Sequence, residues 1–190
     1  MAPLRWSLDD VRERARASFL GLALGDALGA TLEFLTPAEI VTKVEAAMAD
    51  LGKAARAVPA ARFAERPEPE EWSANEVLAH VVAADGYFGG GVVAILEARP
   101  APPRGEGRGN ENAPLRTADA WLEILGRQRR ALFERVSAAD PGAHLDVTIE
   151  HPFFGPLNWR ETLLFTRLHD LDHAGQLGKI AAAFGAAPTR

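Results

Sequence analysis

NWRETLLFTRLHDLDHAGQLGKIAAAFG, residues 158–185, carries the clearest helix signal of the chain. Asn158 and Glu161 form a helix-start pattern, because each side chain can bond a backbone amide near the other. Gly185 suits the left-handed residue that often follows a helix. Apolar residues recur between these ends at helical spacing: Leu163, Leu164, Leu168, Leu171, Leu177, Ile180 and Ala181. The pattern predicts one long helix with a side packed against neighbouring helices.

Two histidines of this helix, His169 and His173, are four residues apart and share one face. A pair at this spacing can bind one metal ion, although a solvated pair beside Asp170 and Asp172 is the alternative. An open catalytic metal site usually has three protein ligands. The third candidate is His80, which lies among apolar residues of another expected helix. Two helices that each offer inward histidines favour a metal site over core histidines.

Neighbouring polar side chains could fix the tautomers of these imidazoles. The candidates for this role are Asp170, Asp172 and Gln176, with Asp85 as a weaker one, although the aspartates could equally solvate the outer face. His144 and His151 lie in loop sequence and are expected at the surface.

Three further helix starts are marked in the same way, by Thr36 with Pro37 and Glu39, by Ser73 with Glu76, and by Thr117. Apolar seams follow each of them. We therefore expect an all-α protein, an antiparallel four-helix bundle with an extra N-terminal helix. Glycines 86 and 89–91 of the second bundle helix could serve close packing, a kink or access to a pocket.

Two connections stand out between these helices. Pro100–Pro114 is low in apolar residues and reads as a long mobile loop, which allows one overhand connection. LDVTIEHPFFGPL, residues 145–157, alternates briefly and then turns. We predict an extended strap there that leads into the last helix without joining a sheet.

The composition limits the function classes. The chain has 190 residues, 47% of them hydrophobic, and a formal charge of -5 without a basic stripe, which argues against nucleic acid as a partner. With no cysteine, any metal must be held by histidine or carboxylate. Acidic residues interrupt the one stretch that resembles a signal peptide, 12–30, and no apolar run reaches membrane length. We expect a cytoplasmic protein that acts on a small molecule, without a membrane partner.

Three separated motifs resemble the DinB-like superfamily, which includes the metal-dependent bacillithiol and mycothiol transferases. They are WSANEVLAH (72–80), HPFFGPLNW (151–159) and HDLDHAGQLGKI (169–180). The resemblance covers about residues 37–184 and implies a four-helix bundle with metal ligands at His80, His169 and His173. It also implies a divalent metal, zinc first, with nickel, iron or manganese as alternatives. A low-molecular-weight thiol is the implied cofactor.

A shorter stretch, RARASFLGLALGDALGATLEFLTPAEI (14–40), is similar to the first helices of ADP-ribosylglycohydrolases. Those enzymes bind paired magnesium ions through later Asp-Asp-Thr/Ser clusters, which this sequence lacks. We therefore divide the chain into an N-terminal helical extension, 1–36, and a bundle domain, 37–187. The glycines at 21, 25 and 29 of the N-terminal extension favour a helix that packs closely or forms a dimer, so a homodimer is plausible.

The leading functional hypothesis is a metal-dependent, thiol-dependent S-transferase that acts on a small electrophile. A non-catalytic binding or stress-response module, in which the metal only staples the bundle, is the alternative. An ADP-ribose-related hydrolase that uses Asp26 is a weaker one.

Overall fold

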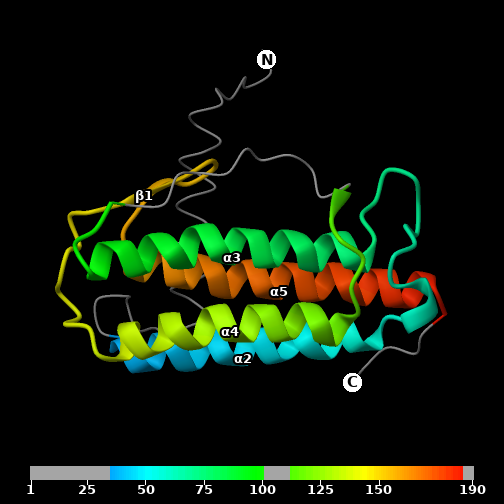
Figure 1. Cartoon of the computed structure of the whole chain (residues 1–190), viewed down its shortest axis with the longest axis horizontal. Helices are drawn as coiled ribbons and strands as arrows, with labels where there is room; N and C mark the ends of the chain where they lie inside the picture. Colours follow the sequence, from blue (N-terminus) through cyan, green and yellow to red (C-terminus); the bar gives the residue numbers. More distant parts are fainter. Residues whose placement is uncertain (1–34, 101–111, 186–190) are drawn as a thin grey trace, which may run out of the picture.

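Four helices make up most of the computed structural model, which describes residues 35–100 and 112–185 (Figure 1). They are α2 (Pro37–Ala57), α3 (Ala74–Leu96), α4 (Ala118–Ser137) and α5 (Trp159–Ala183). A short 3-10 helix, η2 (Ala60–Arg62), follows α2, and two strands, β1 (Ile149–His151) and β2 (Gly155–Leu157), precede α5. The predicted four-helix bundle is confirmed. The expected N-terminal helix and most of the loop at 100–114 lie outside the described residues.

The predicted helix ends are confirmed by their hydrogen bonds. Capping boxes open three helices, between Thr36 and Glu39, between Ser73 and Glu76, and between Asn158 and Glu161. Thr117 caps α4 by accepting a hydrogen bond from the Ala120 amide. Gly185, just after α5, has a φ of 76°, the left-handed conformation expected of it. Local sequence therefore sets where each helix starts and where α5 stops.

The helices pack as a square in which α2 contacts α5 and α4, and α3 contacts α4 and α5. In Figure 1, α3 ends at the left of the bundle and α4 begins at the right, so these two helices run in the same direction. Helices α3 and α5 run in opposite directions. The chain therefore makes one overhand connection between α3 and α4, which the length of that loop had allowed.

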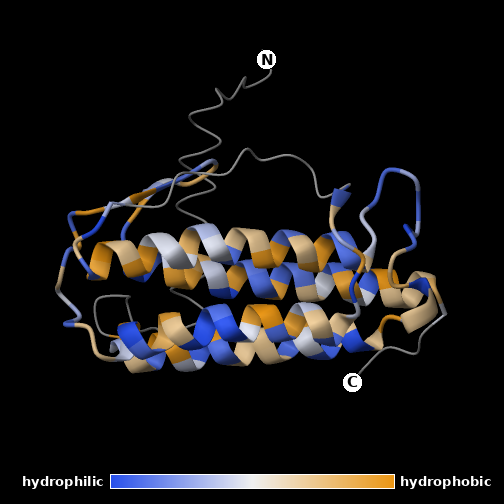
Figure 2. Ribbon diagram, viewed as in Figure 1, coloured by the Kyte–Doolittle hydropathy of each residue, from blue (hydrophilic) through white to orange (hydrophobic). Residues whose placement is uncertain are grey.

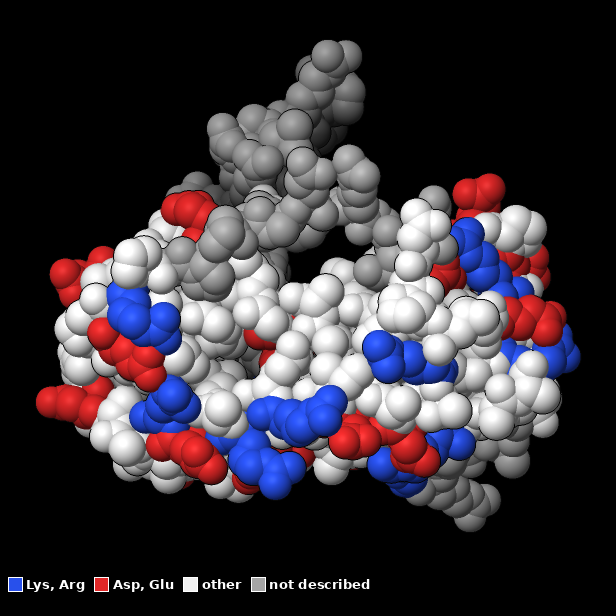
Figure 3. All heavy atoms as spheres, viewed as in Figure 1, with Lys and Arg blue, Asp and Glu red and all other residues white. Residues whose placement is uncertain are grey.

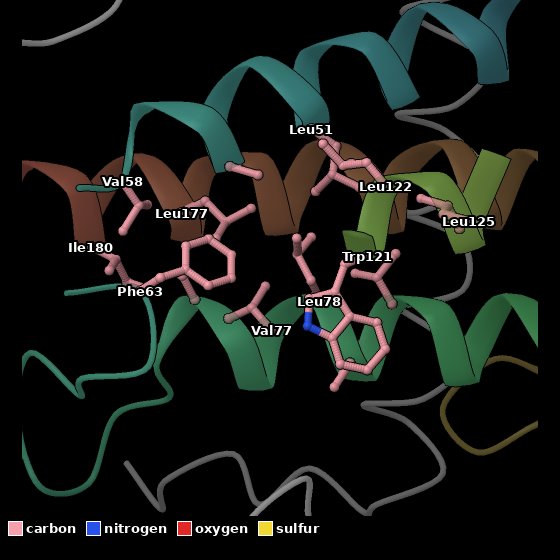
Figure 4. Close-up of a cluster of buried hydrophobic side chains, with 14 of the residues drawn as sticks. Leu51, Val58, Phe63, Val77, Leu78, Trp121, Leu122, Leu125, Leu177 and Ile180 are labelled. Carbon is pink, nitrogen blue, oxygen red and sulfur yellow. The ribbon is translucent and has the colours of Figure 1, made fainter. Parts of the chain in front are cut away.

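Two apolar clusters fill the bundle, one at each end. The first gathers residues from all four helices, including Leu51, Leu78, Trp121 and Leu177 (Figure 4). The second includes Ile40, Val44, Phe88, Leu132, Trp159 and Leu163. Apolar residues recur along each helix in Figure 2, as the spacing predicted. Between the clusters lies a layer of polar side chains, described below.

Residues 145–157 correct one prediction, because the strap does form a sheet. Strand β1 pairs antiparallel with β2, and Ile149 lies opposite Leu157. Both of these side chains are buried, so the hairpin closes over the second apolar cluster. Pairing satisfies the backbone amides that a lone extended strap would leave unbonded.

The glycines of α3 could have served close packing, a kink or access to a pocket, and the structure distinguishes these roles at Gly91. A Cβ atom on Gly91 would lie 2.7 Å from Cδ1 of Ile149, too close for two carbon atoms. Glycine therefore lets β1 approach α3, and close packing is the reason for this residue.

Helix α3 is long and apolar enough to cross a membrane by length and composition alone. Its apolar side chains pack against neighbouring elements in both core clusters. Burial inside the bundle accounts for this hydropathy, as in the core helix of any such bundle.

Candidate metal centre

Three histidine side chains converge from two antiparallel helices. His80 lies on α3, and His169 and His173 lie one turn apart on α5. The Nε2 atom of His169 is 3.1 Å from Nε2 of His80 and 3.1 Å from Nε2 of His173. Within residues 35–100 and 112–185, this is the one group of three or more metal-ligand side chains with donor atoms within 4.8 Å of one another. The structure thus brings together all three predicted ligands.

The spacing of these nitrogens fits a common ligand set for a transition metal. Nitrogens bound tetrahedrally to zinc lie about 3.3 Å from each other, given Zn–N bonds of about 2.0–2.1 Å. The two measured separations, each 3.1 Å, are close to that value. A three-histidine set leaves a fourth position for water or a ligand, as in catalytic zinc sites.

The surroundings keep two of these imidazoles neutral. Burial, together with the neighbouring histidines, lowers the pKa of His169 to about 2. Burial and the charge of His173 also lower the pKa of His80. A neutral imidazole is the form that binds a metal, so both rings are ready to do so at neutral pH.

Gln176 fixes the ring of His173. Its Oε1 atom lies 2.9 Å from Nδ1 of His173, one turn along α5. Because an amide oxygen only accepts hydrogen bonds, Nδ1 carries the proton and donates it. The Nε2 lone pair of His173 is then free to face the other two histidines. The sequence had proposed this role for Gln176, and the geometry agrees.

The two buried aspartates have a different partner from the one expected. Arg129 of α4 donates from Nε to Asp85 of α3 at 2.9 Å. It also donates from Nη1 and Nη2 to the two carboxylate oxygens of Asp170, with 2.9 Å for the Nη2 bond. Asp172 is exposed. Within the described residues, both buried aspartates hydrogen-bond Arg129 and neither bonds a histidine, so the expected hydrogen bond to the imidazoles is not formed.

This buried ionic group forms the polar layer between the two apolar clusters. Asp85, Arg129 and Asp170 each lie, along their own helix, between residues of the first cluster and residues of the second. Asp85, for example, lies between Val81 of the first cluster and Phe88 of the second. Arg129 is 1% exposed and Asp170 is 0% exposed. Burial raises the pKa of both carboxyls, while Arg129 opposes that rise. Burial would lower the pKa of Arg129, but the hydrogen bonds and charges of the two aspartates outweigh it and raise that pKa.

An aromatic wall lines the other side of His169, and it includes a histidine that we expected at the surface. His151 of β1 is buried, at 6% exposed, which corrects that prediction. Its ring centroid lies 4.4 Å from that of Phe165, which in turn lies 5.3 Å from His169. The Nδ1 atom of His151 accepts hydrogen bonds from the Phe153 and Phe154 amides, both at 3.2 Å.

The turn explains why sequence reasoning missed His151. A histidine before a tight Pro-Phe-Phe-Gly turn can accept backbone amides with Nδ1, which pulls its ring inward. His144 is exposed, as predicted.

The surface carries charges of both signs. Lysine and arginine side chains alternate with aspartate and glutamate over the described part of the face in Figure 3. That face shows no extended basic area like those that bind phosphate backbones.

Comparison with known proteins identifies the family. A family model for the DinB superfamily matches residues 43–177, a range that contains His80, His169 and His173. The chain belongs to the DinB superfamily. This confirms the family that the three sequence motifs resembled.

Two further likenesses are partial. A solved structure described as TT2238, a four-helix bundle protein, superposes with a TM-score of 0.57 at 24% identity, over 75% of this chain and 98% of that one. This likeness supports the fold. The ADP-ribosyl-[dinitrogen reductase] glycohydrolase of Rhodospirillum rubrum is 67% identical over 30 residues, which are 16% of this chain and 10% of that enzyme. The chain spans only this small part of that relative.

Proposed function

We propose that this DinB superfamily protein binds one divalent metal ion through His80, His169 and His173 and uses it for thiol-dependent S-transfer to a small electrophile. The convergence of the three Nε2 atoms carries the proposal. Zinc is the first candidate, because three imidazoles with an open fourth position are typical of its catalytic sites. Nickel, iron and manganese are alternatives, since imidazole binds several divalent ions.

The metal would make a thiolate nucleophile available at neutral pH. A bound cation lowers the pKa of a coordinated thiol, so that a thiolate is present at neutral pH. The protein has no cysteine of its own, so the thiol must come from a small molecule. Its sulfur forms a bond to the electrophilic carbon, the leaving group departs with the electrons of the broken bond, and the thiol proton passes to solvent.

The residues of the chain hold and orient this site. Gln176 keeps the Nε2 lone pair of His173 directed at the cluster. Arg129 ties α3 to α5 through Asp85 and Asp170, which holds the helix of His80 against the helix of the other two histidines. The Phe165 ring packs against one side of the His169 ring.

The test is metal analysis of full-length protein purified without a histidine tag, together with His80→Ala, His169→Ala and His173→Ala. We expect close to one metal ion per chain in the wild type and loss of that ion in each variant. His144→Asn is the matched control, because His144 is exposed and has a φ of 54°, which asparagine tolerates. It should keep its metal.

Turnover then separates catalysis from a structural role. Metal-loaded protein should accelerate the reaction of a small thiol with 1-chloro-2,4-dinitrobenzene, and His169→Ala should not. If chelation lowers thermal stability but no thiol is turned over, the metal is a staple of a binding module. Unchanged metal content and activity in His169→Ala would show that the assignment is wrong.

A further inference from the structure

A surface pocket lies beside two of the three histidines, His80 and His173. It has a volume of about 430 Å³ and is lined by Glu70, Glu71, Trp72, Gln176, Lys179 and Ile180. The first three belong to the connector that leads into α3, and the last three belong to α5. Its size suits a small polar molecule, since ligand pockets span about 300–1,000 Å³.

Two of the lining residues touch the candidate metal ligands directly. The Trp72 ring centroid lies 5.1 Å from that of His80. Gln176 bonds Nδ1 of His173 at 2.9 Å. The pocket therefore lies beside two of the three candidate ligands, where Trp72 and Gln176 separate it from His80 and His173.

The pocket presents charges of both signs that no other residue within 35–100 and 112–185 pairs with. Glu70, Glu71 and Lys179 are exposed, and none forms an ion pair with another described residue. Elsewhere on the surface, charged side chains such as Arg56 and Asp119 are paired with one another. Glu70 and Glu71 belong to the connector, and Lys179 belongs to α5. The negative and positive charges of the pocket therefore come from different elements.

The pocket lining also has an apolar part, formed by Ile180 and Trp72. Ile180 is 2% exposed and forms part of the floor, and Trp72 is half-buried. An indole face attracts a cation as well as an alkyl chain. A ligand with a short aliphatic stem, an ammonium group and an anionic group would therefore match the pocket throughout.

We infer that this pocket binds the polar end of the thiol and selects a thiol that carries both an ammonium and an anionic group. Glu70 and Glu71 receive the ammonium, Lys179 receives the anionic group, and Trp72 covers the stem. The inference rests on the proposed function, because the thiol is anchored by its sulfur at the metal.

Binding to full-length, zinc-loaded protein tests it without relying on turnover. Four thiols serve as probes: 2-mercaptoethanol is neutral, cysteamine is cationic, N-acetylcysteine is anionic, and glutathione carries both groups. Affinity is measured by calorimetry at low ionic strength, with the metal content checked after each titration. Glutathione should bind most tightly and 2-mercaptoethanol most weakly.

Variants of the pocket assign each charge. Lys179→Glu should weaken the binding of N-acetylcysteine by about 1.4–5-fold, the range of an exposed charge pair, and should strengthen the binding of cysteamine. Glu70→Gln combined with Glu71→Gln should weaken cysteamine and leave N-acetylcysteine unchanged or tighter. Added salt should reduce these differences. Lys53→Gln on α2 and Glu134→Gln on α4 are exposed controls outside the pocket and should change neither affinity.

The outcomes separate the two proposals. If all four thiols bind zinc-loaded protein with equal affinity in the wild type and in the pocket variants, the pocket inference is overturned and the metal–thiol function stands. If none of them binds while the metal is retained, both are overturned. A preference that inverts in Lys179→Glu supports the inference, because a change in fold alone would not favour one charge over the other.

Discussion

Arg129 of α4 donates two hydrogen bonds to Asp170 of α5, the residue that directly follows His169. The same guanidinium donates to Asp85 of α3, five residues after His80. One side chain therefore links both helices that carry the histidines. The position of the three Nε2 atoms depends on this link as well as on the apolar core.

Arg129→Met should destabilise the metal-free protein by about 3–5 kcal/mol, because it leaves two carboxylates buried without their counter-charge. Urea unfolding measures the change. Arg127→Met on the same helix is the control, since Arg127 is exposed and its pair with Glu123 is a surface one, and it should change stability by less than about 1 kcal/mol. Equal effects from the two substitutions would contradict a structural role for the buried ionic group.

Gln176→Ala should lower metal affinity by about 10–100-fold with little loss of stability, because His173 loses the acceptor that fixes its tautomer. Competition with a chromogenic chelator measures the affinity. Gln176→Glu keeps an acceptor for the His173 Nδ1–H group and should restore most of it. A failure of the glutamate variant to bind metal better than the alanine variant would rule out this role.

Metal-free protein should lose stability as the pH falls below about 6.5. His169 has a folded pKa of about 2, and the pKa of His80 is also lowered, whereas unfolded histidine titrates near 6.5. The unfolded chain therefore binds more protons below pH 6.5, and stability falls with falling pH. Each such histidine contributes up to about 1.4 kcal/mol per pH unit.

Urea unfolding of chelator-treated protein between pH 7.5 and 5 checks this slope above the range in which most carboxylates titrate. His169→Ala should show a shallower slope than the wild type, and His144→Asn should not. Stability that stays constant across this range in the wild type would mean that the histidines are not held neutral in the folded state.

Gly175→Ala should raise stability by about 0.5–1 kcal/mol. Gly175 is exposed inside α5, and a Cβ atom there would meet nothing within 4 Å, so alanine brings its better helix propensity without a clash. Gly91→Val is the contrast, because its side chain would collide with Ile149 and should cost about 1–3 kcal/mol. Thermal unfolding measures both. A stability loss in Gly175→Ala would contradict the open space at that position.

The buried ionic group shows where sequence reasoning stopped short. Arg129 falls four residues after Leu125 and three before Leu132, so it lies on the apolar face of α4. Because Arg130 follows Arg129 in the sequence, the pair resembles two ordinary solvated arginines. Its place on that face was the available signal, but a sequence does not show which buried charge meets which partner.

Local sequence alone determined the helix starts, the end of α5 and the stacking of His169 over His173, because capping bonds and the helical repeat act over three or four residues. Only the tertiary structure decided that His80 meets His169 at 3.1 Å across 89 positions of the chain, that residues 145–157 pair as a hairpin, and that His151 is buried. These features depend on how side chains of different helices pack. A close-packed core fixes these contacts, because each side chain must fit the neighbours that surround it in space. Those neighbours come from distant parts of the sequence, so a local pattern does not reveal them.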